Sequence, residues 1–202
     1  MKTKKMDTRR LVLLAMLSGI LLVMSFTPLG YLNIGPLAIS LNMIPVAIGA
    51  VALGPGGGAF LGAVFGVTSC LQCVGIGGTS AMGVILFEIS PVLTIVQRFV
   101  TRTLAGFLTG LVYRLLEKRH LRISSYIAGF CAALFNTVLF MAALVLLFGN
   151  TEYLQNLIAG RNVLVFIVSF VGINALVELL AATVVVGAVC TALKKLKLIG
   201  GE

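Results

Sequence analysis

Long apolar segments, separated by short polar or glycine-rich joints, run through almost the whole chain. In the block from Leu29 to Gly66, two apolar stretches are interrupted by Gly-Pro steps, and charged residues are absent. A water-soluble domain cannot expose this much apolar surface, whereas a bilayer accommodates helices whose irregular joints find hydrogen-bond partners inside the protein. The pattern therefore predicts membrane helices with irregular joints, which favours a transporter over a simple anchor.

The lengths of the apolar segments predict six membrane-spanning helices in a single transmembrane domain over residues 1–202. A span needs about 20 residues. The predicted all-α bundle has helices at about 11–26, 36–53, 59–74, 91–116, 123–148 and 162–193. The basic stretch before the first helix is similar to the start of a signal peptide, but no small-residue cleavage site precedes Thr27. We therefore expect the first helix to be retained.

Twelve of the fifteen basic residues stand in three clusters beside apolar segments. The clusters are Lys2, Lys4, Lys5, Arg9 and Arg10; Arg114, Lys118, Arg119 and Arg122; and Lys194, Lys195 and Lys197. Cytoplasmic loops of membrane proteins carry an excess of Lys and Arg. Six spans with both termini in the cytoplasm place every cluster inside, whereas five or seven spans would place one cluster outside. The predicted outer loops are then 27–35, 75–90 and 149–161.

Composition agrees with this assignment and excludes several function classes. The chain is 59% hydrophobic and 10% charged, whereas soluble domains carry about 25% charged residues. The net charge of +9 is explained by the cytoplasmic clusters, so no nucleic-acid partner is predicted. The sequence has no G-x-x-x-x-G-K-[ST], H-E-x-x-H or G-x-S-x-G motif, and its only histidine, His120, lies in a basic loop. We therefore predict no catalytic residues, metal or cofactor.

Two small-residue patterns each allow two interpretations. Cys70 and Cys73 form a C-x-x-C without further metal ligands, so they are either small residues near a helix end or a redox or metal pair. Small residues also recur at helical spacing, which lets helix backbones approach closely. These rows are Gly58, Gly62 and Gly66; Ala15 and Gly19; and Gly106 and Gly110. Each row serves either internal packing or docking to another membrane subunit.

Polar residues inside the predicted spans are the candidates for a binding site, because burying an unpaired polar group in hydrocarbon is costly. They are Asn42, Gln97, Arg98, Arg102, Asn136, Asn174 and Glu178. Arg98 and Arg102 share a helix face, as do Asn174 and Glu178, and all four fall at comparable depth. One interpretation is an Arg102–Glu178 ion pair that holds two helices together. The other is a pocket for a small polar molecule, and the excess of arginine suits a carboxylate.

Over nearly its whole length, the chain resembles the substrate-binding S-components of energy-coupling factor (ECF) vitamin transporters of bacteria. The resemblance rests on the segments Gly35–Ser40 and Ile44–Ala50, on Leu53-Gly54-Pro55, and on the glycine row that follows. Supporting segments are Arg102–Tyr113, Asn136-Thr-Val-Leu and Asn174-Ala-Leu-Val-Glu178, and Thr101 stands where the family often has proline. The first half of the chain is most similar to the pantothenate-type subunits, because Leu29-Gly30-Tyr31 is followed by the Gly35–Ser40 run.

The resemblance implies a membrane subunit that binds a vitamin from outside the cell, under outer loops that include Tyr31, Asn33 and Glu88. It implies a membrane scaffold subunit docked at Ala15 and Gly19, and two ATPase subunits that act through the scaffold. The resemblance favours pantothenate as the ligand, and another vitamin or micronutrient (riboflavin, folate or a queuosine-type base) is the alternative. A stand-alone secondary transporter or channel is the alternative of another class, although no internal repeat supports it.

Overall fold

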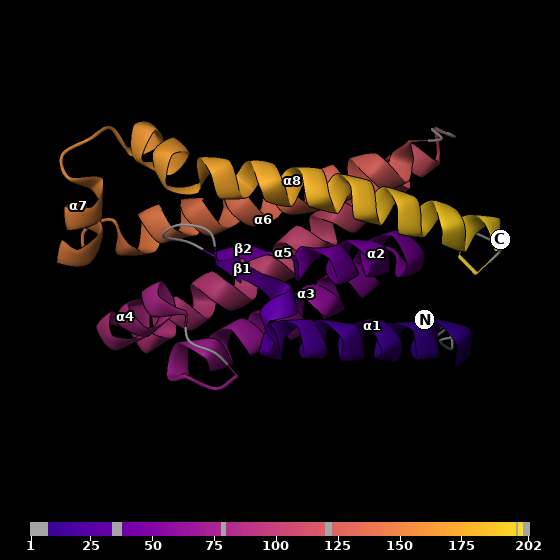
Figure 1. Cartoon of the computed structure of the whole chain (residues 1–202), viewed down its shortest axis with the longest axis horizontal. Coiled ribbons are helices and arrows are strands. Elements are labelled where there is room, and N and C mark those ends of the chain that lie inside the picture. The colour runs from indigo at the N-terminus through magenta and orange to yellow at the C-terminus, as the bar shows by residue number, and fades with distance from the viewer. Residues whose placement is uncertain (1–7, 34–37, 78–79, 120–122, 197, 200–202) are drawn as a thin grey trace, which may run out of the picture.

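The computed structural model describes residues 8–33, 38–77, 80–119, 123–196 and 198–199. Long helices run side by side along the long axis, joined by short helical and extended segments (Figure 1). The helices are α1 (Thr8–Phe26), α2 (Met43–Leu53), α3 (Pro55–Leu71), α4 (Ala81–Ile89), α5 (Pro91–Glu117), α6 (Ser124–Phe148), α7 (Glu152–Ile158) and α8 (Val163–Lys195). Two 3₁₀ turns, η1 (Pro28–Gly30) and η2 (Gln72–Val74), and two strands, β1 (Tyr31–Asn33) and β2 (Ala38–Ser40), complete the described elements.

Five segments of the described residues are long and apolar enough to cross a membrane. They are Thr8–Phe26, Pro55–Val74, Pro91–Glu117, Ser124–Phe148 and Asn174–Lys195. The remaining apolar helix, α2, has 11 residues and therefore extends only about 16 Å. Seven of its eleven residues, from Pro45 to Val51, form an unbroken buried run, so α2 lies inside the bundle rather than against lipid.

The segment before α2 differs from the helix expected over 36–53. Residues 38–40 form β2, which pairs antiparallel with β1 and places Tyr31 opposite Ser40. A helix from residue 36 would place Pro45 in its interior, where the proline ring clashes with the preceding turn. Because α2 begins at Met43, Pro45 falls in the first turn, where backbone N–H groups have no intrahelical partner in any case.

The glycine-rich joint before α3 is also shorter than expected. The predicted helices 36–53 and 59–74 leave residues 54–58 between them as a turn, whereas the observed joint is one residue. Gly54 has a φ of +79° and α3 begins at Pro55, a residue that the first helical position favours. The glycines that follow are helical despite their low helix propensity. Tertiary packing compensates, since a Cβ at Gly58 would lie 2.3 Å from the carbonyl oxygen of Gly106 on α5.

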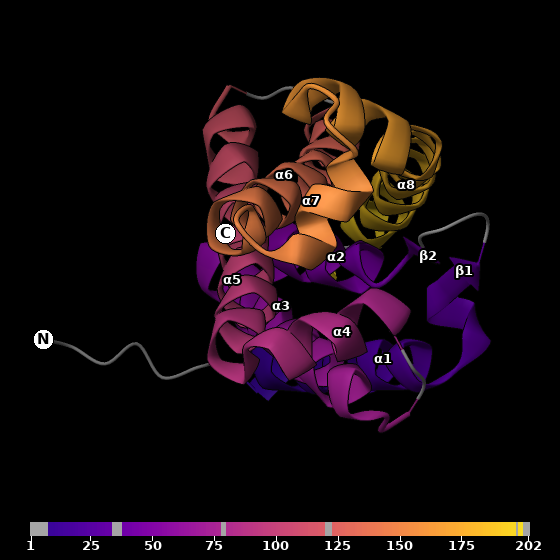
Figure 2. The same ribbon diagram turned by 90° about the vertical axis from the view of Figure 1, so that its left-hand side faces the viewer.

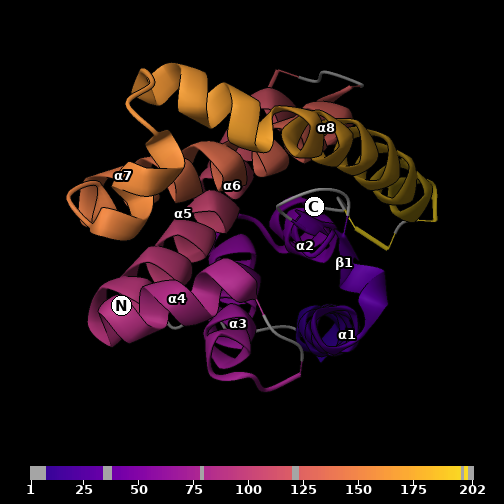
Figure 3. The same ribbon diagram turned by 60° about the vertical axis from the view of Figure 1, so that its left-hand side comes forward.

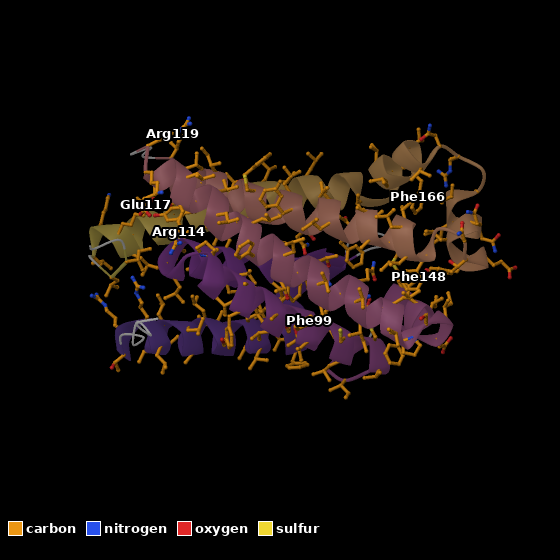
Figure 4. All side chains as sticks on the ribbon, turned by 180° about the vertical axis from the view of Figure 1, so that it is seen from behind. Phe99, Arg114, Glu117, Arg119, Phe148 and Phe166 are labelled. Atoms are coloured by element: carbon orange, nitrogen blue, oxygen red, sulfur yellow. The ribbon has the colours of Figure 1, made fainter. Side chains whose placement is uncertain are left out.

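The two ends of the bundle differ in charge. The start of α1 and the end of α8 lie at the same end, which we call the basic end (Figure 1). Figure 4 labels Arg114, Glu117 and Arg119 there, and Phe148 and Phe166 at the opposite end. That opposite end holds α4 and α7 and is called the α7 end (Figure 2).

Side-chain contacts connect α5 and α8 at the basic end. The buried Tyr113 donates a 2.7 Å hydrogen bond to Glu117, and the Nζ of Lys194 lies 4.9 Å from the centroid of its ring. An ammonium group over an aromatic face is attracted by the ring quadrupole. These contacts give the basic end a fixed packing between two long helices.

Two separate apolar clusters form the core. The cluster toward the basic end includes Leu17, Leu21, Val46, Leu61, Phe65, Ala105, Ala128, Ala132, Val186 and Cys190. The cluster toward the α7 end consists of Met82, Leu86, Met141, Leu144, Phe148, Leu154, Ile158 and Phe166. On α6 and α8, Asn136, Asn174 and Glu178 lie between buried members of the two clusters, and on α5 Arg98 and Arg102 precede the cluster residue Ala105. This places polar chemistry in the middle of an apolar bundle.

Candidate functional site

A cavity of about 560 Å³ lies between the two apolar clusters. The ends of α1 and α3, the end of β2, the start of α4 and the middle parts of α5, α6 and α8 contribute to its wall. Its polar lining residues are Ser25, Thr27, Ser40, Ser69, Gln72, Ser80, Arg98, Arg102, Asn136, Thr137, Asn174 and Glu178. A volume of this size, lined by apolar surface and a limited set of polar groups, is typical of a small-molecule site.

Arg98 projects from α5 into the cavity and is held by two hydroxyl groups. Its Nη1 donates to the Oγ of Ser69 at 2.7 Å, and its Nη2 donates to the Oγ of Ser80 at 3.1 Å. Ser80 is the N-cap of α4, and its side chain also accepts from the N–H of Gly83. A Cβ at Gly83 would lie 2.5 Å from Nη2 of Arg98, so the absence of a side chain there makes room for the guanidinium.

Arg102 lies one turn further along α5 and is packed on aromatic rings. Its guanidinium carbon is 4.4 Å from the ring centroid of Phe65 and 5.5 Å from that of Phe140. The guanidinium of Arg98 lies 6.0 Å from the same Phe140 ring. Both arginines are buried. Two adjacent guanidinium groups in a site of low polarity produce a positive field, which the π faces of the rings only partly offset.

The opposite wall of the cavity, from α6 and α8, supplies amides and a carboxylate. Asn136, Asn174 and Glu178 are each 9% exposed. Glu178 accepts a 2.6 Å hydrogen bond from the backbone N–H of Ser40. Among the described residues, the Oδ1 of Asn136 has no hydrogen-bond partner. The wall therefore offers hydrogen-bonding atoms opposite the two arginines.

Five of the predicted ligand-binding residues come together in this cavity, and two do not. Arg98, Arg102, Asn136, Asn174 and Glu178 line it, whereas Asn42 and Gln97 are completely buried elsewhere. Asn42 precedes α2, with its Oδ1 2.9 Å from a Cβ added at Gly30. Neither amide has a hydrogen-bond partner within the described part of the chain.

The predicted loop residues fall outside the cavity lining that the structure describes. Glu88 is exposed on α4. Tyr31 and Asn33 belong to β1, and their side chains lie outside the described part of the structure. The described lining near the loops comes from Thr27 and Pro28, from Ser40, and from Gly77 and Ser80.

Sequence reasoning missed the hydroxyl and amide groups at the ends of α1 and α3. The Nε2 of Gln72 donates to the carbonyl of Ser25 at 2.7 Å, and the Oγ1 of Thr68 donates to the Oγ of Ser25 at 3.1 Å. These bonds close the cavity wall between two helix ends. Serine and threonine are common in membrane helices, so their identity alone gave no signal. What distinguishes Ser25 and Gln72 is that the fold places them in the lining of the same cavity as Arg98.

The C-x-x-C pair lies beside the cavity wall. The thiol of Cys73 donates to the carbonyl of Ser69 at 3.3 Å, and Cys70 is half-buried. Within the described residues, no group of three or more His, Cys, Asp or Glu side chains is placed to hold a metal ion. The geometry of Cys73 is that of a small residue packed at a helix end.

Comparison with known proteins assigns the family. The model of the family described as ECF transporter, substrate-specific component, matches residues 9–190. The chain belongs to this family. The match confirms the resemblance noted in the sequence, and it identifies this S-component as a multi-pass bacterial membrane protein that takes part in vitamin uptake.

Two curated relatives cover nearly the whole S-component. One is the pantothenic acid transporter PanT of Lactococcus lactis subsp. cremoris, 27% identical over 95% of this chain and 97% of its own length. The other is the pantothenate transporter PanT of Leuconostoc mesenteroides subsp. mesenteroides, 27% identical over 90% of each chain. The family and both names describe transport proteins rather than enzymes.

Proposed function

We propose that this S-component captures pantothenate from outside the cell and delivers it through an ECF importer. The observation that carries the proposal is the cavity, in which Arg98 and Arg102 lie with a single acidic residue, Glu178, among the described lining residues. The names of the two relatives support the choice of pantothenate over riboflavin, folate or a queuosine-type base.

The charges in the cavity favour an organic monoanion. Two guanidinium groups against one carboxylate give the lining an excess of one positive charge, which a ligand carboxylate neutralises. Arginine binds a carboxylate through two parallel hydrogen bonds. We infer that Arg98 and Arg102 bind this group, and that Asn136 and Asn174 bind the hydroxyl and amide groups of pantothenate. Asn42 and Gln97 act only at a distance, by supporting the wall.

We infer that the whole chain is one transmembrane domain with six membrane passes and both termini in the cytoplasm. The hairpin together with α2 forms the second pass, since α2 alone is too short. The basic residues at the start of α1 and at the ends of α5 and α8 support a cytoplasmic basic end. The α7 end and the cavity then face the outside, where the outer loops 27–35 and 75–90, which contribute Thr27, Pro28, Gly77 and Ser80 to the lining, meet the ligand.

We infer that the outward face of α1 is the docking site for the membrane scaffold subunit. Ala15 and Gly19 are exposed, and no described atom lies within 4 Å of a Cβ added at Gly19. Among the described residues, α1 packs mainly against α2, α3 and η1, which leaves one side of the helix open (Figure 3). Two ATPase subunits bound to the scaffold would supply the energy.

The experiment that tests the proposal identifies the bound molecule directly. The full-length protein is purified in detergent, and the small molecules released on denaturation are identified by mass spectrometry; binding of radiolabelled pantothenate is measured by equilibrium dialysis. Released pantothenate and saturable binding support the proposal. Release of a different vitamin, with no competition by pantothenate, rejects it.

A further inference from the structure

Glu178 connects α8 to the hairpin of β1 and β2. Its Oε1 accepts the backbone N–H of Ser40, the last residue of β2, at 2.6 Å, across 138 positions of sequence. Strand β2 and α8 are in contact, and Figure 2 shows the hairpin at the edge of the bundle on the α8 side. The hydrogen bond is short, as expected for a carboxylate acceptor.

The N–H of Ser40 needs this partner because it lies on the free edge of the hairpin. Leu41 donates its N–H to the carbonyl of Gly30, and successive N–H groups of an antiparallel strand point to opposite sides. The N–H of Ser40 therefore points away from β1. A strand edge without a partner is costly at membrane depth, and Glu178, on a continuous helix of 33 residues, supplies a fixed acceptor.

The hydroxyl of Ser40 is placed differently from its N–H. Its Oγ is buried and has no hydrogen-bond partner among the described residues, while Ser40 and Glu178 both line the cavity. A hydroxyl can donate and accept, so it suits an alcohol or amide of a ligand. It is held at the cavity wall only as long as the end of β2 stays against α8.

We propose that Ser40 is a ligand-binding residue and that Glu178 is the residue that positions it. The inference rests on the proposed function and deepens it, because it assigns the end of the hairpin to the binding site. Glu178 then acts on the ligand through the backbone of Ser40. Loss of the hydrogen bond from the Ser40 N–H to Glu178 frees the hairpin from α8.

Hydrogen exchange of the ligand-free protein tests the contact between Glu178 and the hairpin. In Glu178→Ala, amide exchange in the peptide that contains residues 38–41 should accelerate about tenfold, because the edge N–H loses its acceptor. In Glu178→Gln the amide oxygen still accepts, so exchange should stay near that of the wild type. Thr183→Ala, further along α8, serves as the matched control. Unchanged exchange in Glu178→Ala overturns the proposal.

A double-mutant cycle on pantothenate binding tests the role of Ser40. Ser40→Ala and Glu178→Ala should each weaken binding about tenfold, and the double variant should be no weaker than either, because both remove the same contact. Losses that multiply to about a hundredfold, or a Glu178→Gln variant as weak as Glu178→Ala, would mean that the carboxylate binds the ligand itself, which overturns the proposal.

Two variants keep the test decisive if Glu178→Ala does not fold. Ser40→Ala retains the backbone N–H, and Glu178→Gln retains an acceptor, so both should fold. Weakened pantothenate binding in Ser40→Ala with near wild-type binding in Glu178→Gln supports the proposal, and wild-type binding in Ser40→Ala overturns it. A wild-type protein that binds no pantothenate rejects the proposed ligand, while the exchange measurement still decides whether Glu178 holds the hairpin.

Discussion

Gly62 packs directly against the backbone of Arg102, so that a Cβ on this glycine would lie 2.3 Å from the carbonyl oxygen of Arg102. One turn to either side, a Cβ at Gly58 would lie 2.3 Å from the carbonyl oxygen of Gly106, and a Cβ at Gly66 would lie 2.8 Å from the Cα of Phe99. The glycine row of α3 therefore serves internal packing on α5. Because Arg102 lies at the centre of this contact, the row also fixes the depth at which the arginine enters the cavity.

We expect Gly62→Ala to destabilise the protein by about 1–3 kcal/mol, because the added methyl group forces two closely packed backbones apart. Pantothenate binding should weaken in the fraction that folds, since Arg102 moves with α5. Thermal unfolding in detergent and equilibrium dialysis measure the two effects. Gly56→Ala is the matched control on the same helix: no described atom lies within 4 Å of its added Cβ, so stability should hold or rise slightly. Equal unfolding temperatures for the two variants would contradict this packing.

Arg102→Gln should weaken pantothenate binding by about 10–100-fold, because a hydrogen bond to a charged group contributes about 1.5–3 kcal/mol. The sharper comparison uses the alcohol analogue in which the carboxylate of pantothenate is replaced by a hydroxymethyl group. The wild type should prefer the carboxylate, and Arg102→Gln should lose most of that preference. Arg161→Gln, an exposed arginine outside the cavity lining, should bind both compounds as the wild type does. A preference that survives in Arg102→Gln would place the carboxylate elsewhere.

Charged and amide residues are costly to bury in an apolar helix. The sequence therefore predicted the polar residues on α5, α6 and α8 as candidates for a site. Arg98, Arg102 and Glu178 needed no structure to be noticed. Ser40 and Ser69 could not be predicted in this way, since a hydroxyl in a membrane segment is inexpensive and its role depends on what the fold places beside it.

The difference between features that a local pattern encodes and features that depend on the fold also explains which predicted helices were accurate. Long apolar stretches such as α6 (Ser124–Phe148) can only be helical in a membrane, and their bounds follow from length and composition. The block before Met43 is equally apolar, yet residues 31–33 and 38–40 pair as strands. Pro45 is tolerated only near a helix start, pairing satisfies the N–H groups that face the partner strand, and Glu178 accepts the outward N–H of Ser40. Pairing between residues 31–33 and 38–40 joins two separate segments of the chain, which apolar periodicity does not encode.

Gly19→Leu should abolish assembly with the scaffold subunit while pantothenate binding by the isolated subunit stays at the wild-type level. The leucine side chain would prevent close approach of a partner helix to the exposed face of α1. Co-purification of tagged S-component with scaffold and ATPase subunits measures assembly. Ala188→Leu places the same bulk on the exposed face of α8 and should assemble normally. If Ala188→Leu disrupted the complex and Gly19→Leu did not, the scaffold would dock on α8.

Ser80→Ala should loosen α4 and weaken pantothenate binding together, because one hydroxyl both caps α4 and accepts from Arg98. Loss of a helix cap costs about 1 kcal/mol, and Arg98 additionally loses one of its two hydroxyl partners. Hydrogen exchange across residues 81–89 and equilibrium dialysis report the two effects. Thr151→Ala removes the equivalent cap of α7, which has no arginine on its hydroxyl, so exchange in α7 should rise while binding is unchanged. Equal losses of binding in both variants would show that general loosening of the α7 end, rather than the position of Arg98, controls affinity.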